Sequence, residues 1–320
     1  MNDYYDPYRG FGTDGRTWKK SQFHMHNMSW DEDGNFRETL DGMKAFFQEY
    51  KDSDYDIVAH AGHNLLLDTS GLDEELGIRS YNGEEYVDLD GILLVGISKV
   101  LRGEPQDVID ACVADGGFAV ICHPNQNPAL NHSSPIFPPL LTRDVSTRLT
   151  GAVGVEIYSA CLSRRQMNGV GFGVSLATDY WDDALTSGRR LWGFATDDSH
   201  QGYEINIGWT EVLAATTDFP EVRSSVESGA IVASRGLRLY NWIFDGTTLR
   251  VEADLPYFRT GKAEYRFIGD GGEVLQETTG EGATYRLNGT EKYVRVEARN
   301  DDGSILWTQP LLSQANFDLP

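Results

Sequence analysis

Lysine is scarce in this sequence. Only 7 of the 320 residues are lysine, and 49 aspartates and glutamates against 27 basic residues give a formal net charge of −22. Such a negative field repels nucleic-acid backbones and anionic membranes, and the sequence contains no run of Lys and Arg to reverse it. We therefore expect neither nucleic acid nor a membrane as a partner. An acidic, lysine-poor composition favours a halophilic host; an acidic mesophilic protein is the alternative.

Cysteine is also rare, and long apolar runs are missing. The three cysteines, Cys112, Cys122 and Cys161, lack C-x-x-C spacing, which argues against a disulfide framework or a thiolate zinc site and favours buried small side chains. No window approaches the roughly 18 apolar residues of a membrane span, and the first residues lack the apolar stretch of a signal peptide. These absences predict a soluble, cytoplasmic protein.

Short apolar segments alternate with helical patterns between about residues 20 and 236. The predicted strands are 55–62, 91–98, 117–123, 154–160 and 190–196, and the predicted helices are 37–51 and 105–116. Nearly continuous apolar strands separated by helices favour a parallel sheet, either open or closed into a barrel. In both architectures, ligand sites collect at the C-terminal ends of the strands.

The pattern changes after residue 236. From there, apolar and polar residues alternate and the chain turns at Asp-Gly and Asn-Gly pairs, as in 244–246 and 288–289. This alternation predicts antiparallel strands. We therefore expect two domains, a larger α/β domain over 1–236 and a small antiparallel β domain over 237–320.

Histidines mark the predicted strand ends. Six of the seven lie at or beside such an end, namely His24, His26, His60, His63, His123 and His200, whereas His132 lies elsewhere. A lone histidine is usually a hydrogen-bonded structural residue, but six at the strand ends of one domain are hard to explain independently. Because neutral imidazole is a common ligand of zinc, iron and related ions, this placement predicts a metal centre.

The spacing of the histidines and carboxylates supports that prediction. His24 and His26 are two apart, and on a strand this spacing sends both rings to the same face. Asp198 and His200 repeat this spacing, which favours Asp198 over its neighbour Asp197 as a ligand.

Two glutamates add carboxylates beside apolar residues. Glu85 and Glu156 each occupy such a place, where a buried charge needs a partner. Glu84 competes with Glu85 for this role.

The order of these motifs resembles the PHP (polymerase and histidinol phosphatase) family over residues 21–236. H-x-H at 24–26 is followed by G-H-N at 62–64, G-E-E at 83–85, H-P-N at 123–125, E-I-Y at 156–158 and D-x-H at 198–200. The segments WDDALTSGRRLWGFATDDSH and GAIVASRG resemble the carbaryl-hydrolase-type branch, and the C-terminal segment resembles its small β domain. The resemblance implies an α/β fold, a distorted seven-stranded β/α barrel of the PHP type followed by a small antiparallel β domain.

The resemblance also implies two or three divalent metal ions, zinc, manganese or iron. It assigns His24, His26, Glu85 and Asp198 to the first ion, Glu85, His123 and Glu156 to the second, and His63 and His200 to the third. A hydroxide bridging two ions would attack a small phosphate ester. Asp198, His63 and His200 are the expected catalytic residues, and either histidine could protonate the leaving oxygen.

The chain departs from the family pattern near the third ion. Where the family has T-D-H, this chain has Ala61-Gly62-His63, so an acid is missing. His60 could substitute for it or be hydrogen-bonded in the wall. The family's S-D-G is replaced by SWDEDG, which makes Asp31 and Asp33 candidate ligands.

Four residues are candidates for substrate binding. Arg164 and Arg165 could hold a distal phosphate, and Asn64 and Asn125 could donate hydrogen bonds; each could instead be structural. The function favoured by the sequence is a metal-dependent phosphoesterase. The alternatives are a carboxyl-ester or carbamate-ester hydrolase with the same metal site and a metal-binding module without catalysis.

Overall fold

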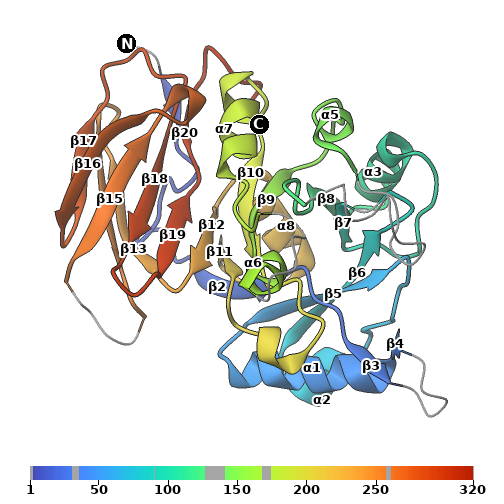
Figure 1. Cartoon of the computed structure of the whole chain (residues 1–320). Helices are drawn as coiled ribbons and strands as arrows, with labels where there is room; N and C mark the ends of the chain where they lie inside the picture. The colour runs from blue at the N-terminus through green and yellow to red at the C-terminus, as the bar shows by residue number, and fades with distance from the viewer. Residues whose placement is uncertain are drawn as a thin grey trace.

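The computed structural model describes residues 3–30, 36–89, 91–126, 141–167, 174–256 and 261–319, and gives the backbone alone for 28–30, 36 and 164–167. The helices are α1 (Leu40–Asp52), α2 (Leu72–Leu76), α3 (Pro105–Ala114), α5 (Arg143–Ser146), α6 (Ala160–Met167), α7 (Thr178–Thr186) and α8 (Phe219–Glu227), with 3₁₀ turns η1 (Gly202–Glu204) and η2 (Asp270–Gly272). Figure 1 shows α1, α2 and α3 around the strands of the first part of the chain, and the later strands as a separate layer at the left.

The strands of the first part carry the predicted metal ligands. They are β1 (Tyr4–Tyr5), β2 (Thr17–Gln22), β3 (Met28–Trp30), β4 (Phe36–Glu38), β5 (Ile57–His63), β6 (Arg79–Tyr86), β7 (Ile92–Val95), β8 (Phe118–Ile121), β9 (Gly154–Ser159), β10 (Trp192–Thr196), β11 (Trp209–Ala214) and β12 (Ile231–Arg235). All five predicted strands are present, and α1 and α3 match the two predicted helices.

Helix α1 shows why the helical pattern succeeded. Thr39 caps its N-terminus, with the hydroxyl accepting a hydrogen bond from the Gly42 backbone N–H at 3.1 Å. Met43, Phe47 and Tyr50 are buried at helical spacing. Burial of this stripe fixes α1 beside β5.

The prediction of an all-parallel sheet is partly wrong. On one side, β2 pairs antiparallel with β11. From β2 onward the strands follow one another in the order β2-β5-β6-β7-β8-β9-β10, and β7 is antiparallel to both β6 and β8, whereas the other neighbours in this order are parallel. The reason is the short connection over 87–91 between β6 and β7. A parallel crossover needs a dozen or more residues, so a short connection gives a hairpin.

The ends of β2 and β10 meet beyond the ladders. An isolated parallel bridge joins Met25 to Ser199, where the Asp198 N–H donates to the His24 carbonyl at 3.0 Å and the His26 N–H to the Ser199 carbonyl at 2.7 Å. This bridge brings the H-x-H and D-x-H segments together. The complete seven-stranded barrel stays a prediction.

The later strands are antiparallel, as the alternation predicts. They are β13 (Arg238–Phe244), β14 (Thr248–Asp254), β15 (Ala263–Ile268), β16 (Val274–Gly280), β17 (Ala283–Arg286), β18 (Tyr293–Arg299), β19 (Ile305–Thr308) and β20 (Leu311–Ser313). Strand β19 pairs with β12, so hydrogen bonding continues from the first part into the second. The domain boundary at 236/237 stays a prediction.

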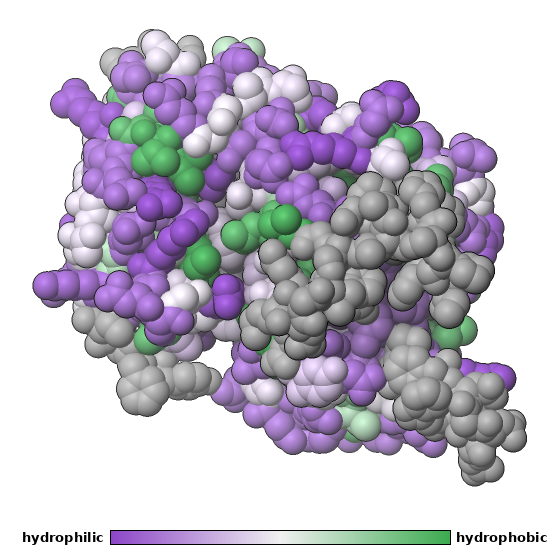
Figure 2. Space-filling view, viewed as in Figure 1, coloured by the Kyte–Doolittle hydropathy of each residue, from purple (hydrophilic) through white to green (hydrophobic). Residues whose placement is uncertain are grey.

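The visible surface agrees with the composition. Hydrophilic residues predominate on the face in Figure 2, and hydrophobic residues form scattered spots. Among the described residues, no helix combines the length and apolar character needed to cross a membrane.

Candidate metal centre

The fold brings the predicted ligands to one end of the sheet. His24 and His26 follow β2, His63 ends β5, Glu85 lies near the end of β6, His123 follows β8, Glu156 lies in β9, and Asp198 and His200 follow β10. The C-terminal ends of parallel strands meet at one edge, so residues far apart in sequence become neighbours.

Glu85 lies at the centre of this cluster. Its Oε2 is 3.1 Å from the His26 Nε2, 3.3 Å from the His63 Nε2 and 3.4 Å from the His24 Nε2. Its Oε1 is 3.0 Å from the His123 Nε2. The two oxygens therefore face different groups of nitrogen donors, as a carboxylate that bridges two cations would.

Asp198 completes the group around His24 and His26. Its Oδ1 is 3.5 Å from the Nε2 of each ring, and these two nitrogens are only 3.2 Å apart. His24, His26 and Asp198 each offer an atom within 4.8 Å of the others, which is close enough for one ion.

Three further sets meet the same distance limit, and one of them contains Cys161, Asp198 and His200. Another contains His24, Glu85, Cys122 and His123, and the third contains His26, His63 and His200. The sets share members, so the described residues offer overlapping groups of donors that could hold a divalent metal ion.

Oxygen atoms behind the rings fix the orientation of three histidines. The Nδ1 atoms contact Glu156 Oε1 at 2.7 Å in His24, Glu38 Oε1 at 2.9 Å in His63, and the Asp198 carbonyl at 3.0 Å in His200. An oxygen acceptor requires the proton on Nδ1, which leaves Nε2 to bind a metal. Such carboxylate–histidine arrangements are typical of metal sites.

Glu156 contacts the cluster from outside. Besides the His24 ring, its oxygens accept hydrogen bonds from the Thr196 hydroxyl at 2.8 Å and the His123 N–H at 2.9 Å. In this structure Glu156 orients His24, and direct binding of a second ion stays a prediction.

The electrostatics of the cluster favour cations. Burial alone would lower the pKa of His24, but Glu156, Asp198 and Glu85 raise it well above its ordinary value. For Glu85, burial opposes ionisation, but the surrounding histidines hold its pKa well below its ordinary value. The site therefore stabilises positive charge among ionised carboxylates. Metal ions would replace the protons on these rings.

In each pair of neighbouring acidic residues, one member lies in the cluster and the other contacts different groups. Spacing favours Asp198 over Asp197, and Asp198 is the member in the cluster. Glu84 accepts the Leu101 N–H at 2.9 Å and pairs with Arg102, away from the histidines. Asp197 accepts the backbone N–H groups of 206–208, each at 2.8 Å, and burial raises its pKa to about 6. Asp197 thus holds the loop after Asp198.

Two cluster members have an unusual backbone. The backbone angle φ is 24° at His123 and 49° at Asp198, values that residues other than glycine rarely adopt. Such conformations persist where the surrounding structure holds them, and they concentrate at functional sites. Here they turn two side chains into the cluster immediately after β8 and β10.

Exposure identifies the open side of the cluster. The side chains of His24 and His26 are fully buried, whereas those of His63 and His200 are 35% and 15% exposed. A substrate would therefore approach from His63 and His200, the residues expected to protonate a leaving group.

Sequence reasoning missed Glu38. Its carboxylate contacts His63 and lies 2.8 Å from the His60 Nε2 and 3.4 Å from the His26 Nδ1. The only sequence signal was an acidic residue just before the N-cap Thr39, a common place for a solvated carboxylate.

Two cysteines that the sequence predicted to be only buried small side chains lie beside the cluster. Cys122 and Cys161 belong to donor sets at the cluster, although all three cysteines are buried and form no disulfide, as predicted. Burial raises the pKa of Cys122 well above its ordinary value, which disfavours the thiolate that a metal requires.

The two candidate substrate-binding asparagines make hydrogen bonds to other parts of the chain. Asn64 uses its side-chain amide to donate to Asp88 and accept from the Val87 N–H, so it holds the β6–β7 turn. Asn125 donates to the Leu176 carbonyl and to Asp179, each at 2.8 Å. Their contact with substrate stays a prediction.

Other candidates lie beyond what the structure describes. Arg164 and Arg165 belong to α6, but their side chains are not among the described ones. Asp31, Asp33 and His132 lie outside the described residues.

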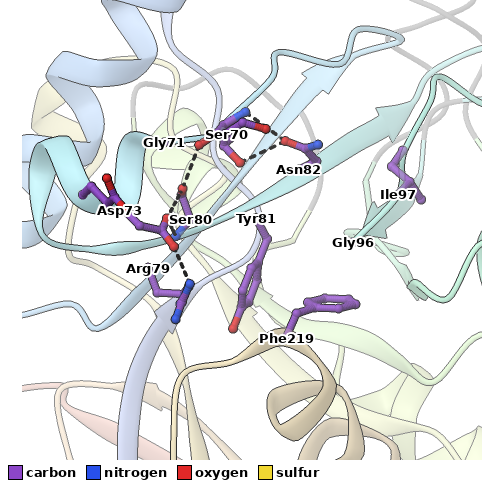
Figure 3. Close-up of a pocket in the computed structure, with 12 residues that line it drawn as sticks. Ser70, Gly71, Asp73, Arg79, Ser80, Tyr81, Asn82, Gly96, Ile97 and Phe219 are labelled. Atoms are coloured by element: carbon purple, nitrogen blue, oxygen red, sulfur yellow. Dashed lines mark hydrogen bonds and ion pairs between the residues drawn. The ribbon is translucent and has the colours of Figure 1, made fainter.

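A separate pocket of about 460 Å³ lies at the other end of β6. Its lining includes Arg79, Tyr81 and Phe219. Figure 3 shows Asp73 between Ser80 and Arg79, and Ser80 Oγ is 2.6 Å from Asp73 Oδ1. Because these polar groups contact one another and Glu85 lies at the opposite end of the strand, the pocket is distinct from the histidine cluster.

Comparisons with known proteins support the fold. No protein-family model and no curated protein sequence matches the chain. The chain is similar to a crystal structure of a two-domain protein from Bacteroides vulgatus that contains a predicted PHP-like metal-dependent phosphoesterase. The two are 13% identical, with 93% of this chain and 96% of that chain covered and a TM-score of 0.51. PsfC from Pseudomonas syringae is 12% identical over 67% of this chain and 90% of its own, with a TM-score of 0.42. The chain therefore has a mixed α/β fold similar to that of a two-domain PHP-like protein.

Proposed function

We propose that this protein is a metal-dependent hydrolase that acts on small phosphate esters. The observation that carries the proposal is Glu85, whose Oε2 faces three histidine nitrogens at 3.1–3.4 Å while its Oε1 faces a fourth, in His123, at 3.0 Å. Two or three divalent ions, zinc, manganese or iron, would fit these donors. The resemblance of the motifs to the PHP family and the fold of the Bacteroides vulgatus protein support the same reaction class.

The residues of the chain have distinct tasks in this proposal. His24, His26 and Asp198 would hold one ion, His123 another, and Glu85 both, with His63 and His200 as ligands of a third ion or as proton donors at the open side. Glu156 holds the His24 ring in place. Bound divalent ions would lower the pKa of a water molecule and neutralise a phosphoryl group. The ions would also reverse the local field of a protein with a net charge of −22, so that an anionic substrate could enter.

Hydrolysis of chromogenic esters tests the proposal. Metal-free protein is loaded with Mn²⁺ or Zn²⁺ and given p-nitrophenyl phosphate, bis-p-nitrophenyl phosphate or naphthyl esters. We expect metal-dependent release of p-nitrophenol that His24→Ala and Asp198→Ala abolish. Hydrolysis of the naphthyl esters alone would replace the phosphoesterase by the carbonyl-ester hydrolase that the carbaryl-hydrolase-type motifs suggest. Stoichiometric metal binding without any hydrolysis would favour a binding module.

A further inference from the structure

A buried carboxylate lies behind two histidines of the cluster. Glu38 Oε1 accepts hydrogen bonds from the backbone N–H of His63 at 3.1 Å and from its Nδ1 at 2.9 Å, and it lies 3.4 Å from the Nδ1 of His26. The Glu38 side chain is only 5% exposed. One oxygen atom thus serves two rings.

These rings are stacked between two carboxylates. The His26 and His63 centroids are 4.0 Å apart with an interplanar angle of 4°. Glu85 Oε2 faces the Nε2 of both rings, at 3.1 Å and 3.3 Å, and Glu38 Oε1 faces the Nδ1 of both. The parallel rings therefore present the same nitrogen to the centre of the cluster.

The other oxygen of Glu38 is held by His60. The His60 Nε2 is 2.8 Å from Glu38 Oε2. Within the described residues, this contact and the 3.4 Å contact between His26 Nδ1 and Glu38 Oε1 are ion-pair distances without hydrogen-bond geometry, whereas the contact between His63 and Glu38 is a hydrogen bond.

The positions of Glu38 and His60 also explain why residue 62, in Ala61-Gly62-His63, is a glycine. A Cβ atom at Gly62 would lie 2.5 Å from the Leu65 carbonyl oxygen, 2.9 Å from His60 Cε1 and 3.0 Å from Glu38 Oε2. A side chain at position 62 would collide with the backbone, so a carboxylate in place of the acid of the family's T-D-H pattern must come from another segment of the chain. Glu38, at the end of β4, fills that place.

We propose that Glu38 is a positioning residue that fixes the orientation and the Nδ1 proton of both His26 and His63, with His60 as its support. This role rests on the proposed metal centre and goes beyond it, because Glu38 acts through the two rings. A carboxylate behind a ligand histidine typically contributes 10–100-fold to metal affinity. Because Glu38 supports two rings, we expect its contribution at the upper end of that range.

Proton positions in the wild-type protein provide the first test. The full chain is labelled with ¹⁵N in its histidines and loaded with Zn²⁺, and long-range ¹H–¹⁵N spectra are assigned with His26→Gln and His63→Gln. We expect the ring proton of His26 and of His63 on Nδ1, with Nε2 bound to zinc. A proton on Nε2, or zinc bound through Nδ1, in either ring would overturn the proposal. This test needs no variant of Glu38 that folds.

Zinc affinity provides the second test. Glu38→Gln preserves the shape of the side chain and removes its charge; Glu84→Gln is the matched control, because Glu84 is a buried glutamate directed away from the histidines. Competition with a chelator should show about a 100-fold weaker affinity for Glu38→Gln and an unchanged affinity for Glu84→Gln. Equal affinities for Glu38→Gln and the wild type would reduce Glu38 to a space-filling role. Zinc binding without ester hydrolysis would refute the proposed function and leave this test intact.

Discussion

Removing the central charge of the cluster should almost abolish metal binding. Glu85→Gln keeps the size of the side chain and removes the charge that faces four histidine Nε2 atoms at 3.0–3.4 Å. The Glu85 side chain is 3% exposed, so water screens this charge poorly. The amide would place a hydrogen-bond donor where a cation needs an acceptor.

The size of the effect follows from the geometry. Two unit charges about 4 Å apart interact by about 4 kcal/mol at an effective dielectric constant of about 20. Since about 1.4 kcal/mol corresponds to a tenfold change in affinity, the unit-charge value alone gives a loss of about 10³-fold for each ion that Glu85 contacts, and the double charge of a divalent ion makes the loss larger.

Elemental analysis after dialysis measures this loss. We expect Glu85→Gln to retain much less than one zinc ion per chain under conditions in which the wild type and Glu84→Gln remain loaded. Far-ultraviolet circular dichroism checks that the variant is folded. A folded Glu85→Gln protein with a zinc affinity within tenfold of the wild type would refute the assignment of Glu85 as the bridge.

Three further predictions follow from the same structure. Asp198→Asn should lose metal and remain folded. Asp197→Asn should keep its metal and lose about 1–3 kcal/mol of stability in urea unfolding, because an amide cannot accept all the N–H groups that Asp197 holds. The reverse pattern would contradict the assignment of the two acids. Removal of the metal with a chelator should lower Tm by about 5–10 °C. A ligand at 100 times its Kd contributes about 2.7 kcal/mol to the free energy of unfolding, and each kcal/mol shifts Tm by about 2–4 °C. An unchanged Tm in calorimetry would argue against a resident ion. Burial lowers the pKa of Lys20 to about 8, so unfolding takes up a proton between about pH 8 and 10, and this group makes stability rise with pH there. Lys20→Met should remove that rise and the exposed control Lys99→Met should not; equal pH slopes in urea unfolding would show that Lys20 is not shifted.

The local features of the chain were predictable because they depend on near neighbours. Helix α1 follows from its apolar stripe, and the spacing of two between His24 and His26 indicates that they act together, although both follow the end of β2. The rule that strand ends share an edge then brings Asp198 to the histidines without knowledge of the topology. No strand was predicted around Glu85, and the resemblance to the PHP family supplied this residue.

Some choices lay outside the reach of local pattern. An apolar run such as that of β7 carries no sign of its direction, which the short connection after β6 decided. Asn64 and Asn125 could equally have faced a pocket, and their partners, Asp88 and Asp179, are 24 and 54 residues away.

The sequence by itself determined the chemical character of the centre: imidazoles and carboxylates at the ends of strands, in a chain too acidic to attract an anion without cations. Only the tertiary structure decided how these groups are held. Glu38 lies 25 residues from His63 and reaches it from β4, where no periodicity relates the two. Glu156 supports His24 across 132 residues. Spacing along the chain fixes which side of a strand a residue occupies, but the packing of distant segments fixes which oxygen lies behind each ring.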